Sequence, residues 1–297
     1  MEIVEVGPRD GLQNEKKVLT TSEKVAYIEL LIRAGLKRIE AVSFARADKV
    51  PQMADAEGVM EAVPRDEGVS YIGLVMNDRG LSRAIETEVD EANFVIVTTD
   101  TFSKRNQGTS VDEALLQLTP MVERAKENEI KTSVTIAASF GCPFEGEVTT
   151  TQVMRIVEVA HSLGVDEIAL GDTIGVGTPS DVRRLISAAR TITDRRLRLH
   201  LHNTRNTGYA NAITGYEMGV DALDSAAGGI GGCPFAPNAT GNIGTEDLYY
   251  LLSRSGVELD INFERLVEAS LFITDRLEIS APAQLSRAGL FPSAINR

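Results

Sequence analysis

The chain has 297 residues, of which 43% are hydrophobic and 25% charged, a composition typical of a folded globular protein. Its net charge of −13 argues against nucleic acid or an anionic membrane as the main partner. No apolar run approaches the roughly 20 residues that a membrane span needs, and strand-like sequence already begins near Glu2, so we expect no targeting peptide. Two cysteines cannot form a disulfide framework here, which favours a reducing cytoplasm.

Short β-branched and apolar runs alternate with longer helical patterns along the chain. The predicted strands are Ile3–Val6, Arg38–Val42, Tyr71–Val75, Ala92–Thr98, Thr132–Ala137, Glu167–Leu170, Leu197–Leu201 and Ala222–Ser225. The predicted helices are Thr21–Ala34, Gln52–Ala62, Asp78–Thr87, Ser110–Asn128, Thr150–Leu163, Ser180–Ile192, Thr207–Met218, Thr245–Ser255 and Phe263–Ile279. Several end at a glycine such as Gly35, Gly164 or Gly219.

This alternation predicts an α/β fold with a parallel sheet and right-handed crossovers. Eight strand–helix units are what a closed TIM (β/α)8 barrel needs, with Phe263–Ile279 as an additional C-terminal helix. A doubly wound open sheet is the alternative, because periodicity does not prove closure. We expect a single domain over residues 1–297, with the extra helix and tail from about residue 258 and a loosely held end from Ala281.

Polar residue types of catalytic kinds collect where the predicted strands end. In a barrel, the active site lies at the C-terminal ends of the strands. The residues found there are Arg9 and Asp10 after strand one, Glu40 on strand two with Ser43 at its end, Asp172 after strand six, His200 and His202 of strand seven, and Cys233 after strand eight. We therefore predict an active site at this end of the barrel.

His200 and His202 lie two residues apart on one predicted strand, so both imidazoles point to the same face. This spacing favours a metal site over the alternative, two hydrogen-bonded core histidines. Oxygen ligands, beginning with Asp10, would shift the preference from zinc toward magnesium or manganese. His161 lies on a predicted helix and is expected to pack or face solvent.

Arg9 could serve as a fixed cation beside developing negative charge, although Arg9 and Asp10 also fit a salt-bridged turn. Cys233 lies in a glycine-rich loop and could be a nucleophile, a proton donor or a small buried side chain. A nucleophile would need its own histidine base, but His200 and His202 are already assigned to the metal site. Proton donation is therefore the better interpretation for Cys233, whereas Cys142 is expected to be structural.

Six motifs in one order are similar to the 3-hydroxy-3-methylglutaryl-CoA lyase family, barrel metallolyases related to the isopropylmalate synthases. They are Glu5-Val-Gly-Pro-Arg-Asp-Gly-Leu-Gln-Asn-Glu15, Val50-Pro-Gln-Met53, Gly141-Cys-Pro-Phe-Glu-Gly146, Leu170-Gly-Asp-Thr-Ile-Gly-Val-Gly-Thr-Pro179, Gly231-Gly-Cys-Pro-Phe-Ala-Pro237 and Gly241-Asn-Ile-Gly-Thr-Glu-Asp247. The resemblance covers nearly the whole chain. It implies a metal-dependent cleavage of a carbon–carbon bond in a 3-hydroxyacyl-CoA, giving acetyl-CoA and a keto acid.

The resemblance also implies roles for individual residues. Metal ligands would be Asp10, His200, His202 and Asn242, holding Mg²⁺ or Mn²⁺; the catalytic set would be Arg9, Asp10, Glu40, Asp172, His200 and Cys233; and Gln13, Ser43, Asn106 and Thr204 would bind substrate. Arg9 would neutralise the thioester enolate, and Cys233 would protonate it. The expected partner is an acyl-CoA, with no nucleic acid and no membrane, in a homodimer or homotetramer.

Three departures from the family pattern concern the distal part of the substrate. The segment after Ser43 differs, Ala169 replaces a serine that contacts substrate in the family, and Asn203-Thr-Arg-Asn206 replaces Asp-Thr-Tyr-Gly. Alternatives are therefore a lyase for citramalyl-CoA or another branched 3-hydroxyacyl-CoA, a synthase that condenses acetyl-CoA with a 2-oxo acid, or a non-catalytic binding barrel.

Overall fold

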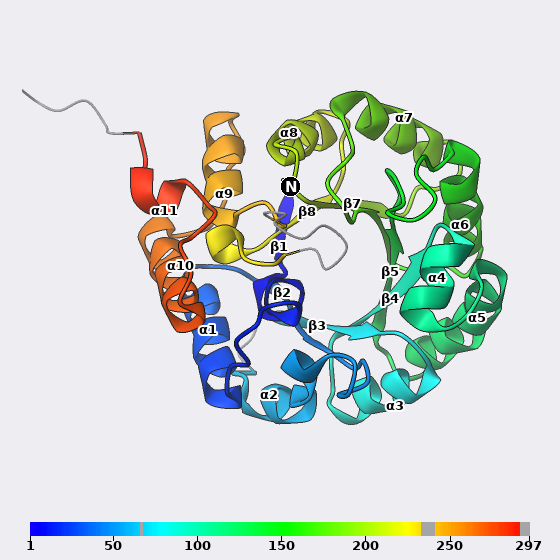
Figure 1. The fold of residues 1–297 in the computed structure, drawn as a ribbon, viewed down its shortest axis with the longest axis horizontal. Coiled ribbons are helices and arrows are strands. Elements are labelled where there is room, and N and C mark those ends of the chain that lie inside the picture. Colours follow the sequence, from blue (N-terminus) through cyan, green and yellow to red (C-terminus); the bar gives the residue numbers. More distant parts are fainter. Residues whose placement is uncertain (66–67, 233–240, 292–297) are drawn as a thin grey trace, which may run out of the picture.

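The computed structural model describes residues 1–65, 68–232 and 241–291. Eight parallel strands close into a barrel in chain order, with β8 paired to β1, and helices surround it (Figure 1). The strands are β1 (Glu2–Glu5), β2 (Arg38–Ser43), β3 (Ser70–Val75), β4 (Glu91–Val97), β5 (Lys131–Ala137), β6 (Glu167–Asp172), β7 (Arg196–Leu201) and β8 (Ala222–Ser225). The predicted TIM barrel is confirmed, and the open sheet is excluded.

The helices around the barrel follow the predicted order. They are α1 (Thr21–Arg33), α2 (Ala56–Ala62), α3 (Asp78–Glu86), α4 (Asp100–Gln107), α5 (Val111–Glu127), α6 (Thr150–Ser162), α7 (Pro179–Arg190), α8 (Gly208–Glu217), α9 (Thr245–Arg254), α10 (Phe263–Leu277) and α11 (Leu285–Ala288), with short turns η1 (Gly7–Gly11), η2 (Pro51–Met53) and η3 (Ala227–Gly229). The additional C-terminal helix α10 packs against α1 (Figure 1). None of the helices described is long and apolar enough to cross a membrane.

Local sequence explains where the helices begin and end. In α1, the Thr20 side chain accepts from the Glu23 backbone N–H while the Glu23 carboxylate accepts from the Thr20 N–H, a capping box. The chain leaves this helix at Gly35, whose φ of +102° favours glycine. These signals are local, which is why the bounds of α1 could be predicted to within one residue.

Three segments differ from the sequence expectation. The helix predicted for Gln52–Ala62 begins only at Ala56, after the short turn η2. The short helix α4 was not expected, because its sequence is polar and only Phe102 and Ser103 are buried. A loosely held end was expected from Ala281, and this is wrong for the first residues of that segment. Ala283 is 1% exposed, and the backbone amides of Gln284 and Leu285 donate to the Asp247 carboxylate on α9.

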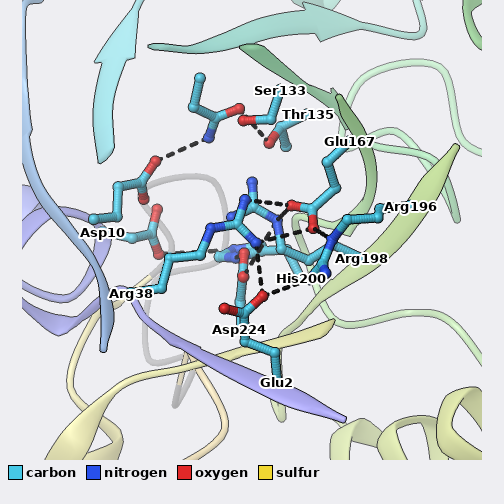
Figure 2. Close-up of polar contacts among 12 residues, drawn as sticks. Glu2, Asp10, Arg38, Ser133, Thr135, Glu167, Arg196, Arg198, His200 and Asp224 are labelled. Carbon is cyan, nitrogen blue, oxygen red and sulfur yellow. Dashed lines mark hydrogen bonds and ion pairs between the residues drawn. The ribbon is translucent and has the colours of Figure 1, made fainter. Parts of the chain in front are cut away.

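Every second side chain along a strand points into the barrel, and several of these inward side chains are charged. At the N-terminal end of the barrel, Arg38 and the fully buried Arg198 both lie beside Glu167 (Figure 2). Arg38 also donates to Glu91, and Arg198 Nε lies 3.1 Å from Glu167 Oε1. Because successive inward residues on a strand are two apart, His200 stands one layer above Arg198. The strand period thus places His200 of β7, and His202 directly after the strand, toward the C-terminal mouth.

Candidate active site

Asp10, His200 and His202 meet at the C-terminal mouth of the barrel. Their ligand atoms all lie within 4.8 Å of one another. The two Nε2 atoms are 3.1 Å apart, and Oδ2 of Asp10 lies 3.8 Å from each. Asp10 lies in η1, the short turn that follows β1 at this end of the barrel. The structure therefore brings together three of the four predicted metal ligands.

The fourth predicted ligand, Asn242, lies beside this cluster. Its backbone forms an antiparallel bridge with His202, and its side-chain Nδ2 donates to Asp10 Oδ2 at 2.9 Å and to the carbonyl oxygen of Ile230 at 3.2 Å. The residue is 3% exposed. An amide oxygen at this place would add a neutral oxygen donor, of the kind that Mg²⁺ and Mn²⁺ accept.

The surroundings of the three residues favour positive charge. Burial raises the pKa of Asp10, but Arg9 and the two imidazoles outweigh this effect and hold the pKa well below its usual range. Burial lowers the pKa of His200, yet the hydrogen bond to Asp224 and the charge of Asp10 raise it overall. Two facing Nε2 atoms can share at most one hydrogen bond. A divalent cation satisfies both lone pairs and the carboxylate, so the donor set fits a metal ion.

Asp224 was missed as a site residue in the sequence. Its Oδ2 lies 3.1 Å from Nδ1 of His200, which leaves Nε2 of that ring directed at the candidate metal position. Asp224 lies on β8 close to His200 (Figure 2). It is 4% exposed. A charged residue inside a predicted strand of a closed barrel was the available signal.

Arg9 and Glu40 form a buried ion pair. Arg9 Nε donates to Glu40 Oε2 at 2.6 Å, and Arg9 Nη1 donates to Asp10 Oδ1 at 2.7 Å. The salt-bridged Arg9–Asp10 pair considered from sequence is thus present, but within the candidate site. Glu40 Oε1 accepts from Asn93 Nδ2 at 2.9 Å, a contact that the sequence did not suggest.

Asp172 ends β6 at the same mouth and is 1% exposed. Burial raises the pKa of Asp172, and the backbone amides of Val176 and Gly177, which donate to its two oxygens, offset only part of that rise. A raised pKa makes this carboxylate a stronger base than an ordinary aspartate, which suits a group that exchanges protons.

The remaining predicted residues differ in their surroundings. Ser43 is fully buried at the end of β2, and its Oγ accepts from the Ala45 amide. The Gln13 Oε1 and Thr204 Oγ1 atoms are buried without a hydrogen-bond partner among the described residues. Asn106 is exposed on α4. Cys233 lies outside the residues that the structure describes.

A cavity of about 300 Å³ adjoins the cluster, and its lining includes Thr204, Arg205, Asn206 and Asn242. Arg205 Nη1 donates to the carbonyl oxygens of Ile174 and Gly175, which joins the loops after β6 and β7. Asn206 has a φ of +63°, a left-handed conformation that asparagine tolerates. The altered segment Asn203-Thr-Arg-Asn206 is therefore compatible with an ordered loop beside the site.

Barrels of this kind carry their active sites at the C-terminal mouth, where these residues lie. We therefore class the protein as a (β/α)8-barrel enzyme with a candidate centre for a divalent metal ion. The HMGL-like family model matches residues 1–273, and the chain belongs to this family.

Known proteins of the same family resemble the chain over nearly its whole length. Mitochondrial hydroxymethylglutaryl-CoA lyase from Bos taurus is 37% identical over 97% of this chain and 89% of that protein. A hydroxymethylglutaryl-CoA lyase from Bacillus subtilis is 36% identical over 95% of both. The structure of an HMG-CoA lyase from Acinetobacter baumannii, in complex with coenzyme A and 3-methylmalate, superimposes with a TM-score of 0.92 at 36% identity, covering 99% of this chain and 97% of that one.

These relatives confirm that the chain is a carbon–carbon lyase with hydroxymethylglutaryl-CoA lyase-like function. They do not favour the synthase or the lyase for another substrate, and they argue against a non-catalytic barrel. The family is metal-dependent, in agreement with the cluster of Asp10, His200 and His202.

Proposed function

We propose that this protein cleaves hydroxymethylglutaryl-CoA into acetyl-CoA and acetoacetate. The observation that carries the proposal is the convergence of Asp10, His200 and His202 with the Arg9–Glu40 pair at one barrel mouth. We infer that the acyl-CoA enters this mouth, since a relative of 36% identity was solved with coenzyme A. Thr204 and Gln13, each with an unpartnered buried oxygen among the described residues, are proposed to contact it.

Asp10, His200, His202 and Asn242 would hold the cation, which we propose to be Mg²⁺ or Mn²⁺. When bound there, a divalent cation lowers the pKa of a hydroxyl group that it contacts. His200 is kept in the required orientation by Asp224, and Asp10 by Arg9. The role of the chain is to hold these donors in place before the substrate arrives.

Asp172 is proposed to accept the proton of the substrate's 3-hydroxyl group. Burial raises the pKa of Asp172, which makes its carboxylate a better proton acceptor than an ordinary aspartate. As the hydroxyl oxygen forms a carbonyl with C3, the C2–C3 bond breaks and its electron pair moves to the thioester as an enolate. The keto product leaves with the new carbonyl group.

Arg9 is proposed to stabilise that enolate. The negative charge appears only along the reaction path, so a fixed guanidinium stabilises the transition state more than the bound substrate. Cys233 would then donate its thiol proton to C2, which yields acetyl-CoA. This role of Cys233 rests on the sequence and on the family resemblance, because the residue lies outside the described part.

A substrate panel tests the proposal. The purified protein with Mn²⁺ should release acetyl-CoA from hydroxymethylglutaryl-CoA, and citramalyl-CoA should be cleaved at least tenfold more slowly. Preferential cleavage of citramalyl-CoA would assign another substrate and would direct attention to Ala169. Release of free CoA from acetyl-CoA and 2-oxoisovalerate would instead establish a synthase.

Two further properties stay predictions. We propose a reducing cytoplasm as the location, in line with Cys142, which is a free buried thiol. We also propose a homodimer or homotetramer, which analytical ultracentrifugation would check.

A further inference from the structure

Asn93 and Thr135 form a hydrogen-bonded pair inside the barrel that the proposed reaction does not use. Asn93 lies on β4 and is 2% exposed, and Thr135 is half-buried on the neighbouring strand β5. The Thr135 hydroxyl donates to Asn93 Oδ1 at 2.9 Å. Such polar side chains in a packed interior need partners, and these two satisfy each other.

The chemistry of the partners fixes the orientation of the Asn93 amide. Its Nδ2 donates to Oε1 of Glu40 at 2.9 Å, and an ionised carboxylate can only accept. Its Oδ1 can only accept, and the Thr135 hydroxyl supplies the proton. A flipped amide would direct Oδ1 at the carboxylate. The hydrogen bonds therefore run in one direction, from Thr135 through Asn93 to Glu40.

Glu40 passes this constraint on to Arg9. Oε1 of Glu40 is held by Asn93, while Oε2 accepts from Arg9 Nε at 2.6 Å. The other side of the guanidinium contacts Asp10. The place of the guanidinium therefore depends on how the Glu40 carboxylate is turned, which Asn93 determines.

We propose that Asn93 and Thr135 are positioning residues, which hold Arg9 through Glu40 where enolate charge develops. The inference rests on the proposed function, because it assigns no new substrate. A displacement of about 1 Å at a reacting centre costs up to about 100-fold in rate. Since Arg9 acts on charge that appears along the reaction path, the loss falls on kcat and leaves KM nearly unchanged.

Steady-state kinetics with hydroxymethylglutaryl-CoA and Mn²⁺ test the assignment. Thr135→Val removes the hydroxyl at equal volume and should lower kcat about 10-fold with KM within twofold, whereas Thr135→Ser keeps the donor and should retain the wild-type kcat. Asn93→Leu should lower kcat about 100-fold. Adding Thr135→Val to Asn93→Leu should cause no further loss, because the two residues act in series.

Ser133→Ala is the matched control. Ser133 lies two residues before Thr135 on the same face of β5, and its hydroxyl donates to Glu91 on β4 one layer deeper, away from Arg9. This variant should keep the wild-type kcat. Thermal unfolding shows which variants fold. If Asn93→Leu fails to fold, Thr135→Val alone tests the proposal.

The positioning role would be overturned if kcat were unchanged in Thr135→Val and Asn93→Leu, or if these variants raised KM instead of lowering kcat. It would also be overturned if Thr135→Ser lowered kcat as much as Thr135→Val. These results require an active wild type, so the proposed function would survive them. A wild-type protein with no turnover of any 3-hydroxyacyl-CoA would overturn both together.

Discussion

The Nε2 atoms of His200 and His202 face each other at 3.1 Å, with the Asp10 carboxylate 3.8 Å from both. Two imidazole nitrogens rarely approach this closely unless something positive lies between them or one ring donates to the other. Here the surrounding carboxylates of Asp10 and Asp224 favour a cation.

We expect Asp10→Asn and His202→Ala to abolish Mn²⁺ binding measured by isothermal titration calorimetry, along with turnover. Chelation by EDTA should inactivate the wild type, and added Mn²⁺ should restore it. The third histidine, His161, lies on α6 and contacts Thr193, so His161→Ala should bind Mn²⁺ normally. Normal Mn²⁺ binding by the Asp10 variant would refute the metal site.

Asp224→Asn should weaken Mn²⁺ binding by about 10- to 100-fold, because the carboxylate orients His200 from behind. Calorimetry measures this effect without reference to catalysis. The variant should keep its secondary structure by circular dichroism. If its affinity equals that of the wild type, Asp224 has no part in orienting the ligand.

Cys233→Ala should lower kcat by about 100-fold or more, as expected for loss of a general acid, while substrate binding persists. Cys142→Ala is the matched thiol control. Cys142 is buried, with its sulfur 3.0 Å from the Thr99 hydroxyl, so it should affect stability rather than turnover. Equal kcat values for both variants would exclude Cys233 as the acid.

Arg38→Ala should destabilise the fold by about 3–5 kcal/mol in urea unfolding. It leaves the buried carboxylates of Glu91 and Glu167 without their shared cation, and the loss of such a partner is costly. Arg46, paired with Asp48 on the surface, provides the comparison. Arg46→Ala should leave the unfolding curve unchanged, and a similar loss in both variants would contradict the argument.

Stability should fall as pH rises because of Glu246. Burial raises its pKa from 4.5 to about 7, so the folded state holds the proton more tightly than the unfolded state. The stability from this group is complete below about pH 4.5 and is lost as pH rises through about 7. Glu246→Gln removes that loss, worth on the order of 3 kcal/mol at pH 8.

Thermal unfolding at pH 5 and pH 8 measures this effect. Between pH 5 and pH 8, the Tm of the Glu246→Gln variant should fall less than the Tm of the wild type. A residual slope is expected from Glu5, whose pKa burial raises to about 8. Parallel pH curves for variant and wild type would show that Glu246 does not titrate in this way.

All eight strands of the barrel could be predicted from the sequence, because each is a local run of residues with its own turn signals. The same holds for the shared face of His200 and His202, which needs only the two-residue period of a strand. The strand ends at Arg9 and Asp172 could be placed at one mouth by the barrel rule.

Only the tertiary structure decided which of these groups touch. Closure of β8 onto β1 sets the register that brings Asp10 to His200 at the end of β7 and to His202 just after it. The contacts of Asn93 with Glu40 and of Asp224 with His200 span 53 and 24 residues, and no local pattern encodes such pairs. Hydrogen bonds across a barrel depend on strand order, tilt and stagger, which the whole chain determines together.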